Sequence, residues 1–399
     1  MDILGLLKEL FSGVLYLFTA EGLKTLVMFV ISGVLIYLAI KKDYEPALLL
    51  PIGFGAILAN LPPVIDQVTG SATASVLGSE GFLTVLFNAG IKNELFPVLI
   101  FIAVGAMIDF SPLLKDPSMI FFGAAAQFGI FATFLLSLVL IPIVLPQTAG
   151  NDSLILRLAS AIGIIGAADG PTTLYVANHF NLADYMAPIS VAAYSYMSLV
   201  PVIQPPVIRA LTSKEERMIR MTYTEERASK LALILFPVIV TVVAGVVVPM
   251  SAPLVGSLMF GNLIRECGVL DSLSETAQKV LANLITLLLG LTVASKMTAD
   301  AFLNKETLLI IALGLVAFVF DTVGGVLFAK FINLFSKKKV NPMIGATGIS
   351  AFPMSARVIH KMGLEEDPQN FLLMHAIGSN VSGQIASVIA GGIILNMIH

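Results

Sequence analysis

Charged residues are scarce in this chain of 399 residues. Asp, Glu, Lys and Arg together make up 12% of it, whereas 57% of the residues are hydrophobic and the mean hydropathy is +0.93. Because a soluble domain carries about 25% charged residues, the composition indicates a membrane-embedded chain. The formal net charge of −3 argues against nucleic acid as a partner.

Cysteine and histidine are rare as well. The single cysteine, Cys267, excludes an intrachain disulfide and a cysteine metal cluster, and the four histidines show no ligand spacing. The N-terminus has Asp2 and Lys8 but no basic region and no clear cleavage site, so we expect no removed signal peptide. By contrast, 32 Gly and 20 Pro are spread through the apolar segments, which is typical of transporter helices with breaks.

Long apolar runs dominate the chain. A helix that spans a membrane needs about 20 apolar residues, and this length predicts an all-α integral membrane protein with about ten or eleven hydrophobic segments. Two further stretches, 253–269 and 341–358, are apolar but interrupted by small residues, and they predict re-entrant or discontinuous helices. Residues 64–93 are polar and predict a loop outside the membrane. The strong segments are 23–40, 46–63, 95–110, 118–145, 153–168, 185–208, 231–249, 276–295, 305–333 and 369–397.

A weak internal echo relates the two parts of the chain. The sequence from Ile165 to Pro171 resembles that from Ile344 to Ser350, and further weak matches follow in the same order. We therefore predict two pseudo-symmetric membrane halves, 1–208 and 231–399, each with a broken helix, near 164–173 and 341–357. An inverted repeat is favoured.

Lysine and arginine cluster in three places: the 209–230 segment with six of them, Lys337–Lys339, and Lys41–Lys42. The positive-inside rule places all three clusters in the cytoplasm. The 209–230 segment is then a charged cytoplasmic loop between the halves. It is either a solvated connector or a docking surface for a soluble partner.

Asp169 is the most informative residue. It follows an apolar run and precedes Gly170-Pro171, which cannot continue a regular helix. A carboxylate at bilayer depth costs several kcal/mol unless it finds a proton, a cation or a polar partner. An acid beside a broken helix therefore predicts a cation site.

The second broken element offers complementary groups. Asn341, Thr347 and Ser350 supply neutral oxygens suited to Na⁺ or H⁺ coordination beside one carboxylate, and Arg357 can hold a carboxylate through two parallel hydrogen bonds. The alternatives are tight helix packing for the small residues and snorkelling of Arg357 to a membrane face.

Other polar groups lie within apolar segments. Tyr194 and Tyr196 could coordinate a cation or relay a proton, or belong to an interfacial aromatic belt. Asn380 could bind an ion, although an Asn in mid-membrane more often bonds to another helix. Asp321 has no adjacent proline break, which favours a structural role.

Several runs together resemble one family. They are Gly166–Thr172, Val191–Tyr196, Ile203–Pro206, Asn341–Arg357, Leu48–Asn60, Gly105–Asp109 and Phe371–Ala376. In order, they are similar to the beta subunit of the sodium-pumping biotin-dependent decarboxylases, which act on oxaloacetate, methylmalonyl-CoA, malonyl or glutaconyl-CoA substrates. The resemblance covers nearly the whole chain. The 64–93 stretch is shorter than in the oxaloacetate member, which leaves the substrate open.

The resemblance implies a function. A carboxyltransferase alpha subunit makes carboxybiotin on a biotin carrier protein. The membrane subunit then decarboxylates it, exports Na⁺ and consumes a proton from the periplasmic side. The chain has no Met-Lys-Met biotinylation sequence, so the biotin must arrive on another polypeptide. A small gamma or delta membrane subunit, a homodimer or homotrimer, and multi-pass insertion in the inner membrane are also implied.

The family pattern also implies roles for residues. Asp169, Tyr196 and Ser350 would form the Na⁺ and proton pathway, with Tyr194, Asn341 and Asn380 completing Na⁺ ligation. Arg357 would engage carboxybiotin or tune the acid, and Asn341 would join it in the biotin site.

One rival explains the same physical features. A Na⁺- or H⁺-coupled secondary transporter of a carboxylate would also need repeats, broken helices, Asp169 and Arg357. A purely structural anchor would not need an acid at bilayer depth.

Overall fold

A computed structural model of the chain describes residues 11–42, 46–62, 64–65, 72–73, 81–182, 185–221 and 228–398. These residues are almost entirely helical. One short antiparallel pair, β1 (Val64–Ile65) with β2 (Ala72–Thr73), joins Val64 to Thr73. The predicted all-α fold class is therefore confirmed.

The helices follow one another along the whole chain. In the first part they are α2 (Ser12–Tyr16), α3 (Ala20–Lys42), α4 (Pro46–Ala59), α5 (Phe82–Gly90), α6 (Leu95–Met107), α7 (Ser111–Lys115), α8 (Met119–Ala126), α9 (Phe128–Val144), the 3-10 turn η1 (Pro146–Thr148), α10 (Asp152–Ile164), the 3-10 turn η2 (Ile165–Ala167), α11 (Gly170–His179), α12 (Met186–Ser198) and α13 (Val200–Leu211). In the second part they are α14 (Lys214–Arg217), α15 (Lys230–Val247), η4 (Pro249–Ser251), α16 (Ala252–Glu266), α17 (Asp271–Thr276), the π-helical η5 (Ala277–Leu281), α18 (Ala282–Ala294), α19 (Ala299–Phe302), α20 (Lys305–Phe335), the 3-10 segment η6 (Pro342–Gly348), α21 (Met354–Glu366) and α22 (Leu373–Met397).

Within the described residues, six helices are long and apolar enough to cross a membrane. Two bent pairs, α5 with α6 at 66° and α12 with α13 at 67°, raise the number to eight if each pair is one span. The chain is thus a multi-pass membrane protein, but the predicted count of about ten or eleven segments is not confirmed. Some predicted segments are short helices, such as α4, which has 14 residues. The six are Ala20–Lys42, Met119–Val144, Lys230–Val247, Asp271–Ala294, Lys305–Phe335 and Leu373–Met397.

Other local predictions had different outcomes. The predicted loop 64–93 contains α5, because the apolar run from Phe82 to Phe87 is long enough to begin a bent span with α6. The predicted discontinuous stretch 253–269 instead holds one continuous helix, α16, which ends at Glu266 and packs against α6. The signal-peptide prediction rests on residues 1–10, which lie outside the described residues. Residues 222–227 of the charged loop also lie outside them. The division into two halves stays a prediction.

The described part of the charged loop is attached to the end of α21. Arg217 is at the centre of this attachment, because its carbonyl accepts hydrogen bonds from Asn341 at 2.8 Å and Asn370 at 2.9 Å. The hydrogen bond from Arg220 also lowers the pKa of the Asp367 carboxyl. This segment is therefore more than a solvated connector. Its ion pairs with the end of α21 are Arg209–Glu365 at 3.0 Å, Arg217–Glu366 at 2.6 Å and Arg220–Asp367 at 2.5 Å, and a further ion pair joins Glu216 to Lys330 on α20 at 3.1 Å.

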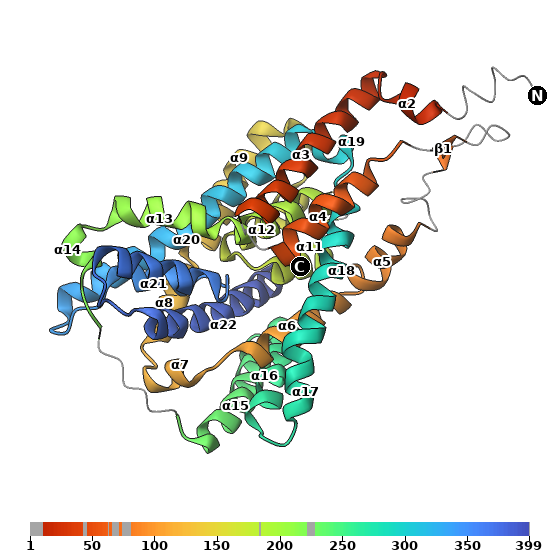
Figure 1. The fold of residues 1–399 in the computed structure, drawn as a ribbon. Helices are drawn as coiled ribbons and strands as arrows, with labels where there is room; N and C mark the ends of the chain where they lie inside the picture. Colours follow the sequence, from red (N-terminus) through yellow and green to blue (C-terminus); the bar gives the residue numbers. More distant parts are fainter. Residues whose placement is uncertain are drawn as a thin grey trace, which may run out of the picture.

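The two broken elements meet inside the helix assembly. Figure 1 shows α20 and α22 running through it, and both contact η6, while α20 also contacts η2. Ser350 N–H donates to the carbonyl of Ala167 at 2.9 Å, which joins the two breaks directly. Only glycine fits at Gly345, because a Cβ there would lie 2.0 Å from the Gly325 carbonyl oxygen on α20. The close approach holds η6 beside η2.

Candidate functional site

Asp169 lies at an abrupt break between helices. Helix α10 gives way to η2 at Ile165, and Ala168 then takes a left-handed conformation with φ of 53°. Asp169 follows in an extended conformation as the N-cap of α11. Pro171 is tolerated in the first turn of α11 because the missing N–H would have no intrahelical partner there. The sequence Ala-Asp-Gly-Pro thus ends one helix and begins the next around one carboxylate.

The carboxylate of Asp169 is buried and held by hydroxyl and amide donors. Its side chain accepts Thr172 N–H at 3.1 Å and Thr172 Oγ1 at 2.7 Å, and Ser387 Oγ donates to Oδ2 at 3.3 Å. The residue is only 3% exposed. These donors and the N-terminal end of α11 favour the negative form of the acid, while burial disfavours it. The two effects oppose each other, so the acid is suited to exchange a proton for a cation.

Asp169 faces a cavity of about 360 Å³. Its polar lining combines four of the residues predicted from the sequence, namely Asp169, Tyr194, Ser350 and Arg357. The volume lies within the range of about 300 to 1,000 Å³ that is usual for small-molecule sites. The remaining polar lining comes from Gln278, Asn283, Thr286 and Gln384. The structure therefore brings an acid, a phenol, a hydroxyl and a guanidinium to one cavity.

Tyr194 is directed at the break by close packing. Its ring lies against Gly170, where a Cβ would be 2.3 Å from the ring carbon Cε1. Its hydroxyl is buried and, within the described residues, has no hydrogen-bond partner. A buried unpaired hydroxyl is costly. This cost is removed if the oxygen coordinates a cation or contacts a bound water in the cavity.

Ser350 connects the second broken element to α22. Its hydroxyl is hydrogen-bonded to that of Ser387 and lies 3.3 Å from the Gly383 carbonyl oxygen, to which it can donate. Ser387 therefore contacts both Ser350 and Asp169. A continuous polar path runs from the carboxylate at the first break to the hydroxyl at the second.

Asn380 supports this path from one side. Its amide donates to the carbonyls of Ile349 at 2.6 Å and Thr347 at 3.2 Å, while its Oδ1 is buried without a partner among the described residues. It is absent from the lining of the cavity that contains Asp169. These two hydrogen bonds hold the end of η6.

Arg357 contributes the positive charge of the cavity. It is an exposed residue on α21, and within the described ranges its guanidinium has no ion-pair partner. Arginine presents paired N–H donors that match a carboxylate. The position and chemistry of Arg357 thus fit an anion that enters the cavity.

Tyr196 and Asn341, two of the predicted site residues, contact residues outside the lining of this cavity. The hydroxyl of Tyr196 donates to the carbonyl of Ile311 on α20. Asn341 donates to the carbonyls of Arg217 and Ile219 and caps η6 through Met343 N–H. Their predicted roles in Na⁺ binding, and that of Asn341 toward biotin, stay predictions.

Asp321 has a structural role in this fold. It lies on α20 and accepts Ile130 N–H at 3.0 Å, which caps the N-terminus of α9 from a neighbouring helix. It does not line the cavity that contains Asp169. The structure therefore shows a contact that fits the predicted structural role.

Sequence reasoning missed several polar residues near Asp169. Gln384 and Ser387 lie four and seven positions after Asn380, which is the spacing of one face of α22. Gln278 lies on the π-helical η5, and such bulges are frequent at functional sites. The helical spacing of Asn380, Gln384 and Ser387 could have been found in the sequence. The π-bulge could not.

The fold and the cavity define a class of protein. Helices broken at membrane depth, a buried acid and neutral oxygens are features of membrane proteins that move cations. Arg357 in the lining of the same cavity carries a charge that attracts anions. The arrangement can therefore hold a cation and a carboxylate close together.

Comparison with known proteins gives the family. Residues 24–398 match the family of the Na⁺-transporting oxaloacetate decarboxylase beta subunit, and the chain belongs to this family. The predicted resemblance is confirmed.

Relatives with different named substrates are almost equally similar to this chain. The methylmalonyl-CoA decarboxylase subunit beta of Propionigenium modestum is 45% identical, with 95% of this chain and 96% of the relative covered. The oxaloacetate decarboxylase beta chain of Klebsiella pneumoniae is 44% identical, with 93% and 94% covered. The glutaconyl-CoA decarboxylase subunit beta of Acidaminococcus fermentans is 45% identical, with 93% and 92% covered.

Proposed function

We propose that this chain is the membrane subunit of a Na⁺-translocating decarboxylase, in which it decarboxylates carboxybiotin and couples this step to Na⁺ export. The observation that carries the proposal is the single cavity that holds Asp169 and Arg357, in a chain of this family. A secondary transporter needs the cation site, but membership of a decarboxylase family favours the chemistry.

The positively charged Arg357 and the negatively charged Asp169 have separate roles. Arg357 binds the carboxylate of carboxybiotin and orients its N–CO₂ bond in the cavity. When that bond breaks, CO₂ leaves and the biotin nitrogen takes a proton. Ionised Asp169, with Tyr194 and Ser350, holds Na⁺. Protonation of Asp169 releases the ion, so one acid alternates between the two cations. Exporting one charge against about 100 mV costs roughly 2.3 kcal/mol.

Tyr196, Asn341 and Asn380 support the proposed site from its surroundings, since none of the three lines the cavity. Asn341 and Asn380 make hydrogen bonds at the two ends of η6, and the hydroxyl of Tyr196 bonds to α20. The Oδ1 atom of Asn380 is buried and accepts no hydrogen bond within the described residues, so it can still coordinate Na⁺.

The proposed complex has further subunits. A biotin carrier protein delivers carboxybiotin, a carboxyltransferase alpha subunit loads it, and a small gamma or delta subunit shares the membrane. The chain assembles as a homodimer or homotrimer in the inner membrane. Because relatives at 44% and 45% identity carry different substrate names, we place the choice of substrate on the carboxyltransferase subunit.

The test is a reconstitution. We expect proteoliposomes with the whole complex to release CO₂ from the carboxylated carrier only when Na⁺ is present, and to accumulate Na⁺ at the same time. Vesicles with every subunit except this one are the control. Carboxylate uptake driven by Na⁺ without CO₂ release would instead establish the secondary transporter.

The two tyrosines provide a matched pair of substitutions. Tyr194→Phe removes a cavity hydroxyl that makes no hydrogen bond among the described residues, so the protein should stay as stable as the wild type. The half-saturating Na⁺ concentration should rise about fivefold, the effect of one neutral polar contact of about 1 kcal/mol. Tyr196→Phe loses the bond to Ile311. It should lower the thermal midpoint instead.

Na⁺-stimulated CO₂ release and thermal unfolding, measured on both variants, separate the two roles. A rise in the Na⁺ requirement for Tyr196→Phe at unchanged stability would show that Tyr196 belongs to the ion pathway. An unchanged Na⁺ requirement for Tyr194→Phe would remove Tyr194 from the site.

A further inference from the structure

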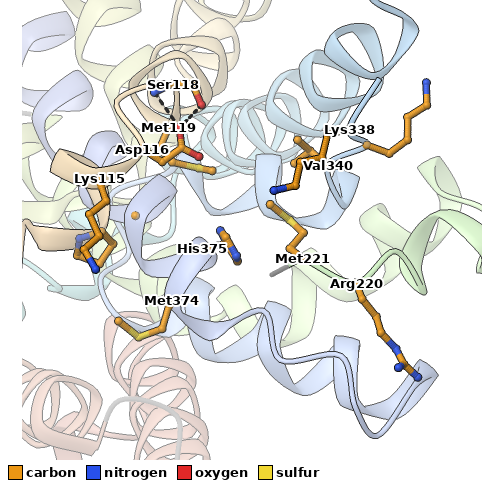
Figure 2. Close-up of a pocket in the computed structure, with 13 residues that line it drawn as sticks. Lys115, Asp116, Ser118, Met119, Arg220, Met221, Lys338, Val340, Met374 and His375 are labelled. Atoms are coloured by element: carbon orange, nitrogen blue, oxygen red, sulfur yellow. Dashed lines mark hydrogen bonds between the residues drawn. The ribbon is translucent and has the colours of Figure 1, made fainter. Parts of the chain in front are cut away.

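A second cavity, of about 370 Å³, shares no lining residue with the cavity that contains Asp169. Figure 2 shows the residues that line it. Four segments form it: the connection from α7 to α8, the residues after α14, the residues before η6, and the first turns of α22. None of its lining residues belongs to the site described above. The lining residues are Pro112, Lys115, Asp116, Ser118, Met119, Arg220, Met221, Lys338, Lys339, Val340, Met374, His375 and Gly378.

The cavity lies where membrane spans end. Met119 is the first residue of one candidate span, Met374 is in the first turn of another, and Lys338 follows the end of a third. Three spans that end around one hollow place it at the level of lipid headgroups. Two of the charged clusters that the positive-inside rule assigns to the cytoplasm contribute to the lining, through Arg220 and through Lys338 and Lys339.

The lining is predominantly basic. It contains four Lys or Arg side chains and one carboxylate, that of Asp116. This carboxylate accepts Ser118 N–H at 3.2 Å and Ser118 Oγ–H at 2.5 Å, so it is already engaged by local donors. Arg220 is paired with Asp367 and extends away from His375 (Figure 2). Four cationic side chains against one carboxylate give the lining an excess of positive charge, which favours an anion.

Apolar side chains complete the wall. Met119, Met221 and Met374 lie around the hollow together with Pro112 and Val340. Methionine is flexible and adapts to irregular apolar ligands. A free inorganic ion gains no stabilisation from apolar side chains, whereas the glycerol part of a phospholipid can pack against them.

We propose that this cavity binds a phosphate group, carried by an anionic phospholipid or present as free phosphate. Basic pockets between spans on the cytoplasmic side suit anionic headgroups, and the methionine wall favours the lipid as the source. The site adjoins both elements that complete the Asp169 path, because Val340 leads into η6 and Gly378 lies two positions before Asn380 on α22. A bound headgroup should hold the starts of η6 and α22 in place.

The experiment uses the purified complex in neutral detergent at low salt. Thermal unfolding is followed while inorganic phosphate, dioctanoyl phosphatidylglycerol or dioctanoyl phosphatidylcholine is added. A ligand that binds only the folded state raises the midpoint in a concentration-dependent way. We expect phosphatidylglycerol to raise it, phosphate to do so at higher concentrations, and phosphatidylcholine to have little effect.

Two double variants provide the comparison. Lys115→Gln/Lys338→Gln should raise the half-saturating phosphatidylglycerol concentration about 25-fold, or about fivefold for each lysine. Lys41→Gln/Lys42→Gln removes the same charge from exposed positions outside the cavity and should behave as the wild type. Stronger binding of phosphate than of phosphatidylglycerol would support the anion site and assign it to the free ion.

Two results would overturn the inference. One is an identical response of the wild type and Lys115→Gln/Lys338→Gln to all three ligands. The other is loss of partner subunits from that variant with unchanged ligand responses, which would show that the basic lining contacts a protein. Neither result depends on carboxybiotin chemistry, so the proposed function stands or fails separately.

Discussion

Asp169→Asn should abolish Na⁺-stimulated decarboxylation and Na⁺ transport while leaving the complex assembled. Asparagine is as good an N-cap as aspartate, so α11 should still begin at Gly170 and the thermal midpoint should change little. What disappears is the negative charge that holds Na⁺ and the group that exchanges it for a proton. Loss of a positioned acid–base group lowers turnover by a factor of about 100 or more.

Asp321→Asn is the matched control for this variant. Asp321 is also a buried acid that accepts an N–H at the start of a helix, from Ile130. It lies outside the cavity, so its variant should keep Na⁺-stimulated turnover within about twofold of the wild type. The measurements are CO₂ release against Na⁺ concentration and Na⁺ uptake into vesicles. Normal Na⁺ stimulation of Asp169→Asn would remove Asp169 from the ion site.

The site could be predicted from the sequence where a local pattern forced the chemistry. Asp169 was identifiable because the Gly-Pro after it breaks the helix at bilayer depth. Arg357 and Ser350 were identifiable because they flank the second break. All three line the same cavity.

Three-dimensional contacts decided what the sequence could not show. Tyr194 and Tyr196 are two positions apart and lie in the same apolar run, so nothing local distinguishes them. Helix geometry turns them to different sides: Tyr194 packs on Gly170, whereas Tyr196 bonds to Ile311. Asn341 was chosen for its oxygen, but its amide holds the carbonyl of Arg217, more than 100 positions away along the chain.

The fold, like the site, could be predicted only where a local sequence pattern determined it. The length of the apolar runs predicted the helical class, and it located the six long spans. It could not separate a span from a short helix ended by a turn, because both are equally apolar. Helix α10 illustrates this, since it ends at Ile164, where η2 begins within an unbroken apolar sequence.

Arg357→Leu should weaken the use of carboxybiotin far more than the binding of Na⁺. A hydrogen-bonded contact with a charged group contributes about 1.5–3 kcal/mol, so the KM for the carboxylated carrier should rise about 10- to 100-fold. The half-saturating Na⁺ concentration should change less than about threefold, because Asp169 and its donors Thr172 and Ser387 are untouched. Arg357 is exposed and unpaired within the described ranges, so folding should not suffer.

Two further substitutions distinguish the contribution of the paired N–H donors of Arg357 from that of its positive charge. Arg357→Lys keeps the positive charge but loses the paired donors, so its KM should lie between those of the wild type and Arg357→Leu. Lys361→Leu removes an exposed charge one turn further along α21, outside the cavity, and should leave KM unchanged. An equal loss of carboxybiotin use and Na⁺ affinity in Arg357→Leu would contradict a separate anion site. The cavity would then act as one indivisible site, in which the arginine tunes Asp169 instead of binding the carboxylate.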